Sequence, residues 1–474
     1  MPHPVVRANP KVDKKTEMTA LPLYKQKVVE EIRLISKLAR LKSLQRADFN
    51  PFMLYSEDIA VDLLTDSGTG ALSQEQRVAE EKGDETYCGS KSWRSLERSA
   101  QRVLGFPYVI PVHQGRGAEH VVDFVLVKKG SLVPGNAHFD TTKANIEVMG
   151  GKPVDCTISE AYDPSSGFQF KGNIDLARLE KILKKSGKKI PYVLSTITCN
   201  QVGGQPVSME NLKKSSALCK KYGIRFFLDV ARFAENAYFI KKREKGFTKK
   251  SIKSIIDEMM LCADGALMSA KKDALNQSGG LILLRDKKLF ETLQPYGALF
   301  AGGIQYGAMS GKAMESLTIG LKEGIKERYL EYRIAQVEHM GNKLRETGVP
   351  IVLPIGGHAV FVNAGEWLPH IRWGLFPGHS LACALYLEGG VRGVEIGSLL
   401  ENRDPKTHEN RRAKWELLRL AIPHRLYTQE HLDYVANVFE KLSWKLPSVR
   451  GVEFVRETYP MRHFTSKFKL AKAD

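Results

Sequence analysis

Two adjacent lysines follow an apolar segment in the run Met268-Ser269-Ala270-Lys271-Lys272-Asp273. Burial at the end of a strand removes water from an ammonium group, lowers its pKa and favours the neutral amine. A neutral lysine amine can form a Schiff base with an aldehyde. Paired lysines after a strand also occur in solvated turns, and the spacing alone leaves both interpretations open.

An acid closes a second apolar run, Ile224–Asp229, which is typical of a buried strand. Asp229 could hold a proton on the ring nitrogen of a pyridine cofactor, which maintains the ring as an electron sink. A turn or helix N-cap aspartate is the other interpretation. Arg232, three residues later, could reach the phenolate side of the same ring. The acid-ended strand and the lysine-ended strand together favour a pyridoxal-phosphate site more than either does alone.

A glycine turn at His113–Glu119 follows the strand-like segment Tyr108–Val112. A strand, a glycine turn and a helix in this order form phosphate-binding sites, because free backbone N–H groups and the positive helix end face the anion. Arg116 would add charge-assisted hydrogen bonds. A purely structural turn is the other interpretation of this motif.

The three motifs need a framework, and strand-like and helical patterns alternate from about residue 59 to residue 320. Such alternation predicts an α/β fold with a mostly parallel sheet, and the carboxyl ends of its strands would bring the motifs together. The clearest predicted elements are strands at 192–197, 225–229 and 279–284, a helix at 209–222 and a long helix at 317–345.

The remaining patterns predict a second, smaller α/β domain, with strands at 359–362 and 417–422 and a helix at 428–442. The first 50 or so residues predict an irregular arm and then a basic amphipathic helix, Tyr24–Arg46. We expect an N-terminal arm that contributes to the small domain (1–58), a large cofactor-binding domain (59–325) and a C-terminal small domain (326–474).

The composition is that of an ordinary globular protein, with 474 residues, 43% of them hydrophobic and 26% charged. The net charge is +18, but the excess lies in short clusters such as Lys241–Arg243 and in a basic tail, which is typical of hydrated surface. We expect no specific nucleic-acid binding and no membrane span. Six scattered cysteines indicate neither a zinc site nor disulfides, so we expect a cytoplasmic protein.

Several blocks of this chain, in one order, resemble the β-eliminating lyase family from about residue 50 to residue 467. They are residues 62–70 (DLLTDSGTG), 83–90 (GDETYCGS), 113–119, 203–208 (GGQPVS), 235–241 (ENAYFIK), 269–273 and 356–361 (GGHAVF). The resemblance implies an aspartate-aminotransferase-like fold of type I, with a mostly parallel seven-stranded sheet and a smaller α/β domain. It also implies pyridoxal phosphate as the cofactor, a bound potassium ion, an amino-acid substrate, and a homotetramer whose active sites share groups across a dimer interface.

The same resemblance implies roles for individual residues around the cofactor. Lys272, rather than Lys271, would form the Schiff base, and Asp229 would pair with the pyridinium nitrogen. Phe139 would stack on the ring. The other cofactor contacts would be Asn200 and Arg232 near the ring oxygen, and Gln114, Gly115, Arg116, Ser269 and Lys271 near the phosphate.

On the substrate side, the resemblance implies that Arg419 holds the α-carboxylate, with Thr65 and Ser67 nearby. An arginine suits this task because its guanidinium can bind a carboxylate through two parallel hydrogen bonds. Tyr87 would transfer a proton near the leaving group. The potassium ligands would be Glu85 and the backbone around Gly68.

Three positions bear on which leaving group the family member releases. The enzymes that release phenol from tyrosine have an arginine, a threonine and a phenylalanine at the positions of Ile396, Asp140 and His463. An acid can accept the indole N–H, a donor that phenol lacks, and an apolar side chain suits the indole face. We therefore expect β-elimination of L-tryptophan to indole, pyruvate and ammonia. Release of phenol from L-tyrosine is the alternative.

Three segments depart from the family pattern without removing an expected catalytic group: Val230, Asn276–Ser278 and Ala301–Tyr306. An alternative from another class is a basic binding protein that has kept the fold and lost turnover. The presence of Lys272, Asp229 and Arg419 counts against that alternative.

Overall fold

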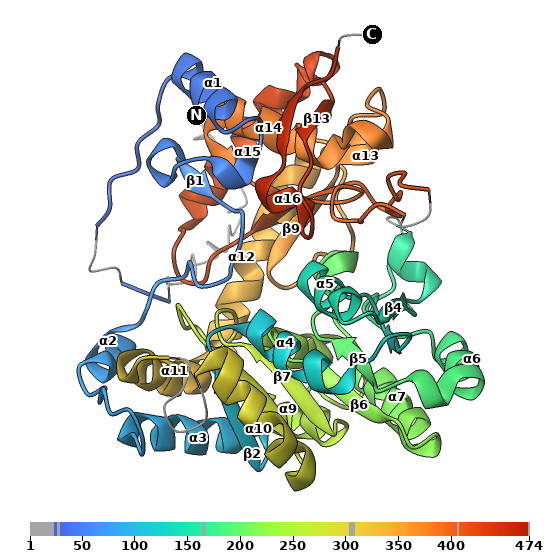
Figure 1. Cartoon of the computed structure of the whole chain (residues 1–474). Helices are drawn as coiled ribbons and strands as arrows, with labels where there is room; N and C mark the ends of the chain where they lie inside the picture. The colour runs from blue at the N-terminus through green and yellow to red at the C-terminus, as the bar shows by residue number, and fades with distance from the viewer. Residues whose placement is uncertain (1–22, 26–28, 164–165, 303–308, 405–406, 473–474) are drawn as a thin grey trace, which may run out of the picture. The chain divides into compact units, whose positions relative to one another are not determined.

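The computed structural model describes residues 23–25, 29–163, 166–302, 309–404 and 407–472 (Figure 1). The chain divides into two compact units, Met1–Glu31 and Ile32–Asp474, and the elements below all belong to the second unit. The predicted boundaries at residues 58 and 325 fall inside this second unit and stay predictions. Among the described residues, no helix is both long and apolar enough to cross a membrane.

A seven-stranded sheet forms the centre of the larger part of this unit. Its strand order is β2 (Tyr108–Val112), β8 (Gly280–Leu284), β7 (Gly265–Ser269), β6 (Arg225–Asp229), β5 (Tyr192–Thr196), β3 (Leu132–Gly135) and β4 (Lys152–Asp155). Strand β8 is antiparallel to both of its neighbours, and the other pairings are parallel. The mostly parallel seven-stranded sheet predicted for this region is therefore confirmed.

Strands β5, β7 and β8 are buried along their whole length, which explains their almost unbroken apolar sequences. Helix α4 packs on β7 and β8, α10 packs on β2, and α7 packs on β6. The helices of this region are α2 (Gln74–Glu80), α3 (Lys91–Leu104), α4 (Gly115–Leu126), α5 (Asp140–Val148), α6 (Leu176–Ser186), α7 (Met209–Lys221), α8 (Phe233–Arg243), α9 (Ile252–Leu261), α10 (Lys287–Ala301) and α11 (Gly311–Gly324).

A smaller antiparallel sheet lies in the C-terminal part, in the order β11 (Val394–Ile396), β12 (Leu417–Ala421) and β9 (Ala359–Asn363). Helix α12 (Glu327–Glu346) leads into this region, as the yellow-orange helix of Figure 1 shows. The other elements here are α13 (Ala364–Trp367), α14 (Pro377–Gly389), α15 (Gln429–Ser443), α16 (Arg462–Thr465), β10 (Val391–Arg392), β13 (Val452–Arg456) and β14 (Lys467–Leu470).

Residues near the N-terminus pack on this C-terminal region. Strand β1 (Val61–Asp62) pairs in parallel with β10, and helix α1 (Lys37–Arg46) contacts α14. The contact fits the expectation that the N-terminal arm contributes to the small domain.

Most of the predicted elements are confirmed to within one residue, namely those at 192–197, 209–222, 225–229, 279–284, 359–362, 417–422 and 428–442. Two helix predictions are wrong. The amphipathic helix expected at Tyr24–Arg46 begins only at Lys37, where Ser36 caps it by accepting from the Ala39 N–H at 3.2 Å. Residues 29–36 form no regular element, and most of their apolar side chains are exposed, such as Val29 at 94%.

The long helix expected at 317–345 is two helices, α11 and α12, which are separated at Ile325–Lys326. The apolar periodicity continues through both helices and hides the break. Gly324 at the end of α11 lies so close to the chain that an added Cβ would be 1.9 Å from the carbonyl oxygen of Asp273. The end of α11 therefore packs directly on the segment that follows the lysine pair.

Candidate active site

A cavity of about 260 Å³ lies between the carboxyl ends of β5, β6 and β7 and the small antiparallel sheet. It brings together almost every residue that the sequence nominated: Thr65, Ser67, Gln114, Gly115, Arg116, Phe139, Asp140, Asn200, Asp229, Arg232, Ser269, Lys271, Lys272, Ile396, Arg419 and His463. Three predicted residues, Glu85, Tyr87 and Gly68, do not line it in this single chain. The roles of all of these residues stay predictions.

The two adjacent lysines have different surroundings. Lys272 Nζ donates to Ser269 Oγ at 2.8 Å, and burial lowers its pKa to about 8, with the nearby charge of Arg232 adding to the effect. Lys271 Nζ donates to Gln114 Oε1 at 3.0 Å, and burial also lowers its pKa. Asp229 acts on Lys272 electrostatically, so this lysine and the predicted ring-nitrogen partner face the same space. Of the two lysines, Lys272 has the surroundings that favour a neutral, nucleophilic amine.

The start of helix α4 forms one end of the cavity. Gln114 is the N-cap residue, and its side chain makes no hydrogen bond to the helix, which leaves the N-terminal amides open toward the cavity. A Cβ on Gly115 would lie 2.8 Å from Ser269 Cβ, so only glycine lets the helix end approach the end of β7 this closely. Together with Arg116, the helix end and Ser269 form an anion site of the predicted kind.

Asp229 ends β6, where it pairs in register with Thr196 of β5 and Leu267 of β7. Its Oδ1 accepts from the Ala231 N–H at 3.0 Å, and burial raises its pKa. A buried carboxylate with a raised pKa gains free energy when a cation is placed beside it. A protonated pyridine nitrogen is such a cation.

Arg232 lines the cavity, but it is held by a partner that the sequence did not indicate. Its Nε and Nη2 donate to the two oxygens of buried Asp66, at 3.0 and 2.7 Å. Despite burial, the Arg232 charge keeps the pKa of Asp66 well below its ordinary value. The ion pair fixes the guanidinium in one orientation at the cavity wall.

Arg419 and Asn200 meet in the wall of the same cavity. Arg419 Nη1 donates to Asn200 Oδ1 at 3.0 Å, and Nη2 donates to the Leu64 carbonyl at 3.0 Å. His358 Nε2 contacts the same Asn200 oxygen at 2.9 Å. Among the described residues, Arg419 Nε and Asn200 Nδ2 are buried without a hydrogen-bond partner. Two donors are therefore left for a bound anion or for a ring oxygen.

Asp140 and His463 form a buried pair at the mouth of the substrate side, with Nε2 of the histidine 3.0 Å from Oδ2 of the acid. Burial acts to raise the pKa of Asp140, but His463 outweighs it and the pKa lies below its ordinary value. Ile396 is 5% exposed and packs in an apolar cluster with Phe361 and Trp415. One wall thus offers a hydrogen-bond acceptor and another offers an apolar face.

An aromatic group completes this side of the cavity. The His463 ring lies 4.2 Å from the Phe464 ring and 5.6 Å from the Phe52 ring, measured between centroids. Phe52 and Phe464 both line the cavity, and the Arg116 guanidinium lies 5.7 Å from the Phe464 centroid. Aromatic rings at these separations form the kind of surface on which a planar substrate packs.

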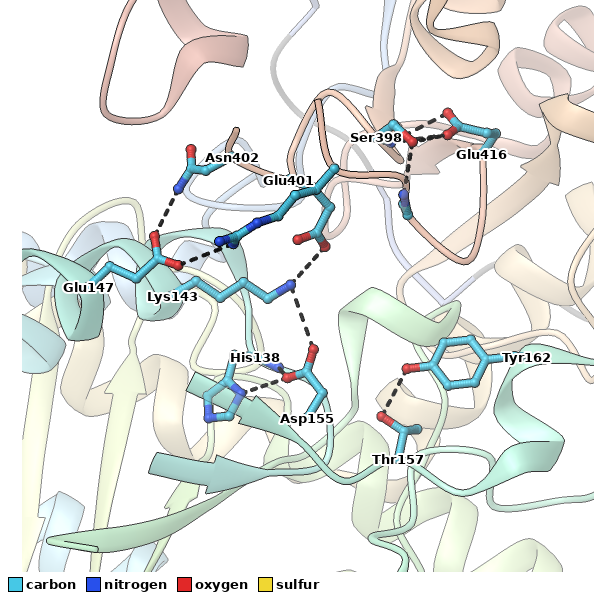
Figure 2. A network of polar contacts seen from close by, with 12 residues as sticks. His138, Lys143, Glu147, Asp155, Thr157, Tyr162, Ser398, Glu401, Asn402 and Glu416 are labelled. Atoms are coloured by element: carbon cyan, nitrogen blue, oxygen red, sulfur yellow. Dashed lines mark hydrogen bonds and ion pairs between the residues drawn. The ribbon is translucent and has the colours of Figure 1, made fainter. Parts of the chain in front are cut away.

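Helix α5, which begins at Asp140, also connects the large sheet to the segment after β11 (Figure 2). Lys143 Nζ donates to Glu401 Oε1 at 2.9 Å and lies 3.6 Å from Asp155 Oδ2. His138 Nδ1 lies 2.7 Å from the other oxygen of Asp155. Burial acts to lower the pKa of Lys143, but Asp155 and Glu401 outweigh it and raise the pKa. The lysine stays charged and holds two distant segments together.

The next turn of α5 repeats this connection. Glu147 Oε2 accepts from Asn402 Nδ2 at 2.9 Å, and its Oε1 lies 4.0 Å from Arg411 Nη1 (Figure 2). A second, small cavity borders these contacts and shares Asp140 and His463 with the main cavity. The position of Asp140 is therefore linked to the contacts of α5 with Glu401, Asn402 and Arg411.

The three predicted residues outside the cavity have other surroundings. Tyr87 is 71% exposed. Glu85 Oε2 accepts from the Gly311 N–H at 3.3 Å, and the Gly68 N–H donates to the Lys271 carbonyl at 2.8 Å. Of the segments that depart from the family pattern, Val230 is fully buried and Asn276 Nδ2 donates to the Ser278 carbonyl. Residues 303–306 lie outside the described part of the chain.

Sequence reasoning missed several residues of the site. Asp66 and His358 lie inside the blocks 62–70 and 356–361, which could have indicated them, whereas Phe52 and Phe464 lie in no such block and reach the site only through the fold. Glu119 also lines the cavity, and the sequence did provide a signal for it. It lies inside the phosphate-turn motif, where a second negative charge would repel a bound phosphate.

The cavity fits the cofactor that the sequence predicts. The depressed pKa of Lys272, the open helix end at Gly115, the unpartnered Asn200 Nδ2 and the half-buried acid Asp229 match the aldehyde, phosphate, ring oxygen and ring nitrogen of pyridoxal phosphate. Phe139, at the N-cap of α5, supplies an aromatic face in the same cavity.

Comparison with known proteins agrees with this geometry. A protein-family model described as "Beta-eliminating lyase" matches residues 62–438. A tyrosine phenol-lyase of Symbiobacterium sp. is 43% identical over 94% of this chain and 98% of its own length. A tryptophanase of Salinibacter ruber is 45% identical over 95% of this chain and 96% of its own length. Sequence identity alone therefore does not separate the two activities.

Solved structures share the fold at low sequence identity. A structure described as SPT with PLP has a TM-score of 0.59 and 15% identity, and the match covers 87% of this chain and 97% of the other. An aminotransferase from Staphylococcus aureus has a TM-score of 0.58 and 15% identity, with 81% and 94% covered. At this identity the likeness concerns the fold alone.

Proposed function

Because the chain belongs to the β-eliminating lyase family and is a carbon–carbon lyase, we propose that it releases indole from L-tryptophan, with pyruvate and ammonia as the other products. The observation that carries this proposal is the buried Asp140–His463 pair in the same cavity as Ile396. The family and the fold of type I, which the chain shares with pyridoxal-phosphate enzymes, support pyridoxal phosphate as the cofactor.

When bound, pyridoxal phosphate withdraws electrons from the Cα of the attached amino acid. We propose that the α4 N-terminus, Arg116 and Ser269 hold its phosphate, that Asp229 keeps its ring nitrogen protonated and that Phe139 covers one face. Asn200, which has a free donor, supports the same assignment at the ring oxygen.

Lys272 supports removal of the Cα proton. Its side chain is partly buried in the cavity wall, and with a pKa of about 8 a substantial fraction is neutral near pH 8 and able to accept a proton. Arg419, which lines the cavity and whose buried Nε has no hydrogen-bond partner, supports binding of the substrate α-carboxylate, with Thr65 and Ser67 nearby. Holding the carboxylate fixes which Cα bond faces the lysine.

The leaving group decides between the two activities of the family. Indole has an N–H donor, and Asp140, whose pKa is held below its ordinary value, is ionised and able to accept it. His463 keeps that carboxylate charged, and Ile396 presents an apolar surface where an arginine would be needed to meet a phenol hydroxyl. A buried cation facing an indole would be costly.

Indole leaves only after a proton reaches its C3 atom, and we propose Tyr87 as a donor. Because Tyr87 is 71% exposed in one chain, it would act in the cavity of a neighbouring copy within the proposed homotetramer. Glu85 and the backbone at Gly68 would bind the proposed potassium ion. The cysteines at positions 88, 156, 199, 219, 262 and 383 are all free, which supports the proposed reducing cytoplasm.

Release of phenol from L-tyrosine is the second candidate, because relatives that carry that name are 43% identical over nearly the whole chain. The deciding experiment incubates purified protein, pyridoxal phosphate and potassium with each amino acid and measures indole and phenol. Indole release from tryptophan should be the faster reaction. Faster phenol release would overturn the proposal, and release of neither product, without a cofactor absorbance band, would support a binding protein that has lost turnover.

A further inference from the structure

Glu119 is a buried acid in the cavity wall that the proposed reaction does not use. It lies on the second turn of α4, directly after the glycine turn, and is 8% exposed. Its two carboxylate oxygens accept from two hydroxyls of another helix, Thr141 Oγ1 at 2.7 Å and Thr142 Oγ1 at 2.5 Å. The carboxylate is therefore a clamp between α4 and α5.

The clamp acts on the corner of the chain that carries two site residues. Thr141 and Thr142 form the first turn of α5, immediately after the N-cap residue Phe139 and after Asp140. The Thr141 N–H also donates to Asp140 Oδ1 at 2.6 Å. Moving either threonine would therefore move the aromatic ring and the acid that face the cofactor and the leaving group.

Burying the Glu119 carboxylate beside other acids costs free energy, so the contacts it makes with α5 need an explanation. Burial raises the pKa of Glu119 to about 7, and its acidic neighbours Asp229 on β6 and Asp140 on α5 add to the effect, while the threonine hydroxyls oppose it. Glu119 in turn acts to raise the pKa of Asp123 on the same helix and of Tyr192 on β5. A neutral residue would avoid this repulsion but could not accept two hydroxyls with charge-assisted strength.

We infer that Glu119 is a positioning residue. It holds the start of α5 against α4, the helix proposed to bind the phosphate, and so fixes the Phe139 ring and the Asp140 carboxylate relative to the bound cofactor. The assignment rests on the proposed cofactor site and not on the choice between indole and phenol. Glu119 joins the helix at the anion end of the cavity to the helix at the leaving-group end through two hydrogen bonds.

The chain offers a matched control on the same helix. Asp123 lies four residues further along α4, is fully buried, and is hydrogen-bonded to Tyr192 in the core rather than to α5. It does not line the cavity. Asp123→Asn therefore reports the general cost of altering a buried acid of α4, without disturbing the Phe139–Asp140 corner.

The experiment measures pyridoxal-phosphate affinity of the apo protein and the visible circular dichroism of the bound cofactor. We expect Glu119→Ala to weaken the affinity about tenfold and to change the dichroic band, because two hydroxyls lose their acceptor. Thr142→Val, which keeps the side-chain shape and leaves the cavity lining intact, should act in the same direction by about threefold. Asp123→Asn should leave both signals as in the wild type.

Unchanged affinity and dichroism in Glu119→Ala, or an equal loss in Asp123→Asn, would overturn the positioning role. If Glu119→Ala does not fold, affinity and dichroism are measured on Thr142→Val alone. Wild-type values in that variant would also contradict the positioning role of Glu119. A wild-type protein that binds no pyridoxal phosphate would instead sink the proposed function, which separates the two failures.

Discussion

The two sides of the cavity are built in different ways. On the cofactor side, Asp229 and Ser269 end neighbouring strands of one sheet, and Lys272 follows within three residues. On the leaving-group side, Asp140, Ile396 and His463 come from α5, β11 and α16, which are far apart in the sequence. The difference suggests that cofactor chemistry is fixed by the sheet, whereas the leaving group is chosen by segments that can change without disturbing it.

The largest expected effect breaks the cofactor side. Lys272→Ala should abolish covalent attachment of the cofactor and lower turnover at least about 1000-fold, since it removes both the attachment point and the Cα base. Absorbance near the cofactor band and steady-state rates measure the two effects. Lys271→Ala is the matched control and should keep the attachment; loss of attachment in that variant alone would reverse the assignment.

The leaving-group side is tested by Ile396→Arg. A guanidinium placed in this apolar wall would lose hydration against an indole face, so kcat/KM for tryptophan should fall about 100-fold. Cofactor affinity should stay unchanged. An unaltered ratio of tryptophan to tyrosine activity would contradict the role given to this wall.

A smaller effect is expected for His463→Phe. Phenylalanine keeps the ring contacts with Phe52 and Phe464 but removes the 3.0 Å contact to Asp140. The kcat/KM for tryptophan should fall about 10-fold, because the acid that accepts the indole N–H loses its partner. A substrate with a better leaving group than indole, assayed in parallel, should be much less affected; an equal loss on both substrates would argue for a purely structural histidine.

The pH dependence of cofactor attachment reports on Lys272. Its pKa is lowered from the ordinary value to about 8, so the reactive neutral amine increases as the pH rises toward 8. Attachment to the apo protein should therefore accelerate about fivefold between pH 7 and pH 8 and level off above that. Stopped-flow absorbance measures the rate. A rate that keeps rising tenfold per pH unit up to pH 10 would show an ordinary lysine.

The smallest effect concerns the ion pairs that hold helix α5 in place. Lys143→Met removes the bridge from Asp155 to Glu401 but keeps most of the aliphatic stem. We expect the KM for tryptophan to rise about threefold with little change in kcat, as for a partly buried ion pair. Lys213→Met, which removes an exposed pair to Glu258, is the control. Equal effects of the two changes would deny α5 a role in substrate binding.

The cofactor side was largely predictable because its residues stand in recognisable local sequence patterns. An acid or a lysine at the end of an apolar run is unusual, and the strands Arg225–Asp229 and Gly265–Ser269 do end where the apolar runs end. The glycine turn before α4 is a similar signal. Parallel strands bring such ends to one edge of the sheet, so the sequence could foresee their meeting.

The rest depended on contacts that no local pattern records. The Arg232–Asp66 ion pair and the Asn200–His358 contact join segments that are distant in the sequence. The contact of Glu119 with two threonines was likewise not predicted, because the two threonines lie on another helix. Apolar periodicity also failed to predict a helix end. The pattern runs through both α11 and α12, whereas α11 ends at Gly324, which lies against Asp273.

The most direct test of indole selection exchanges the three leaving-group residues together, as Asp140→Thr, Ile396→Arg and His463→Phe. The measurement is the ratio of kcat/KM for tryptophan to that for tyrosine, with pyridoxal-phosphate affinity recorded on the same protein. We expect the ratio to favour tryptophan in the wild type and to fall by more than about 100-fold in the variant, at unchanged cofactor affinity. An unchanged ratio with the cofactor still bound would contradict the assignment of these three residues to the leaving group.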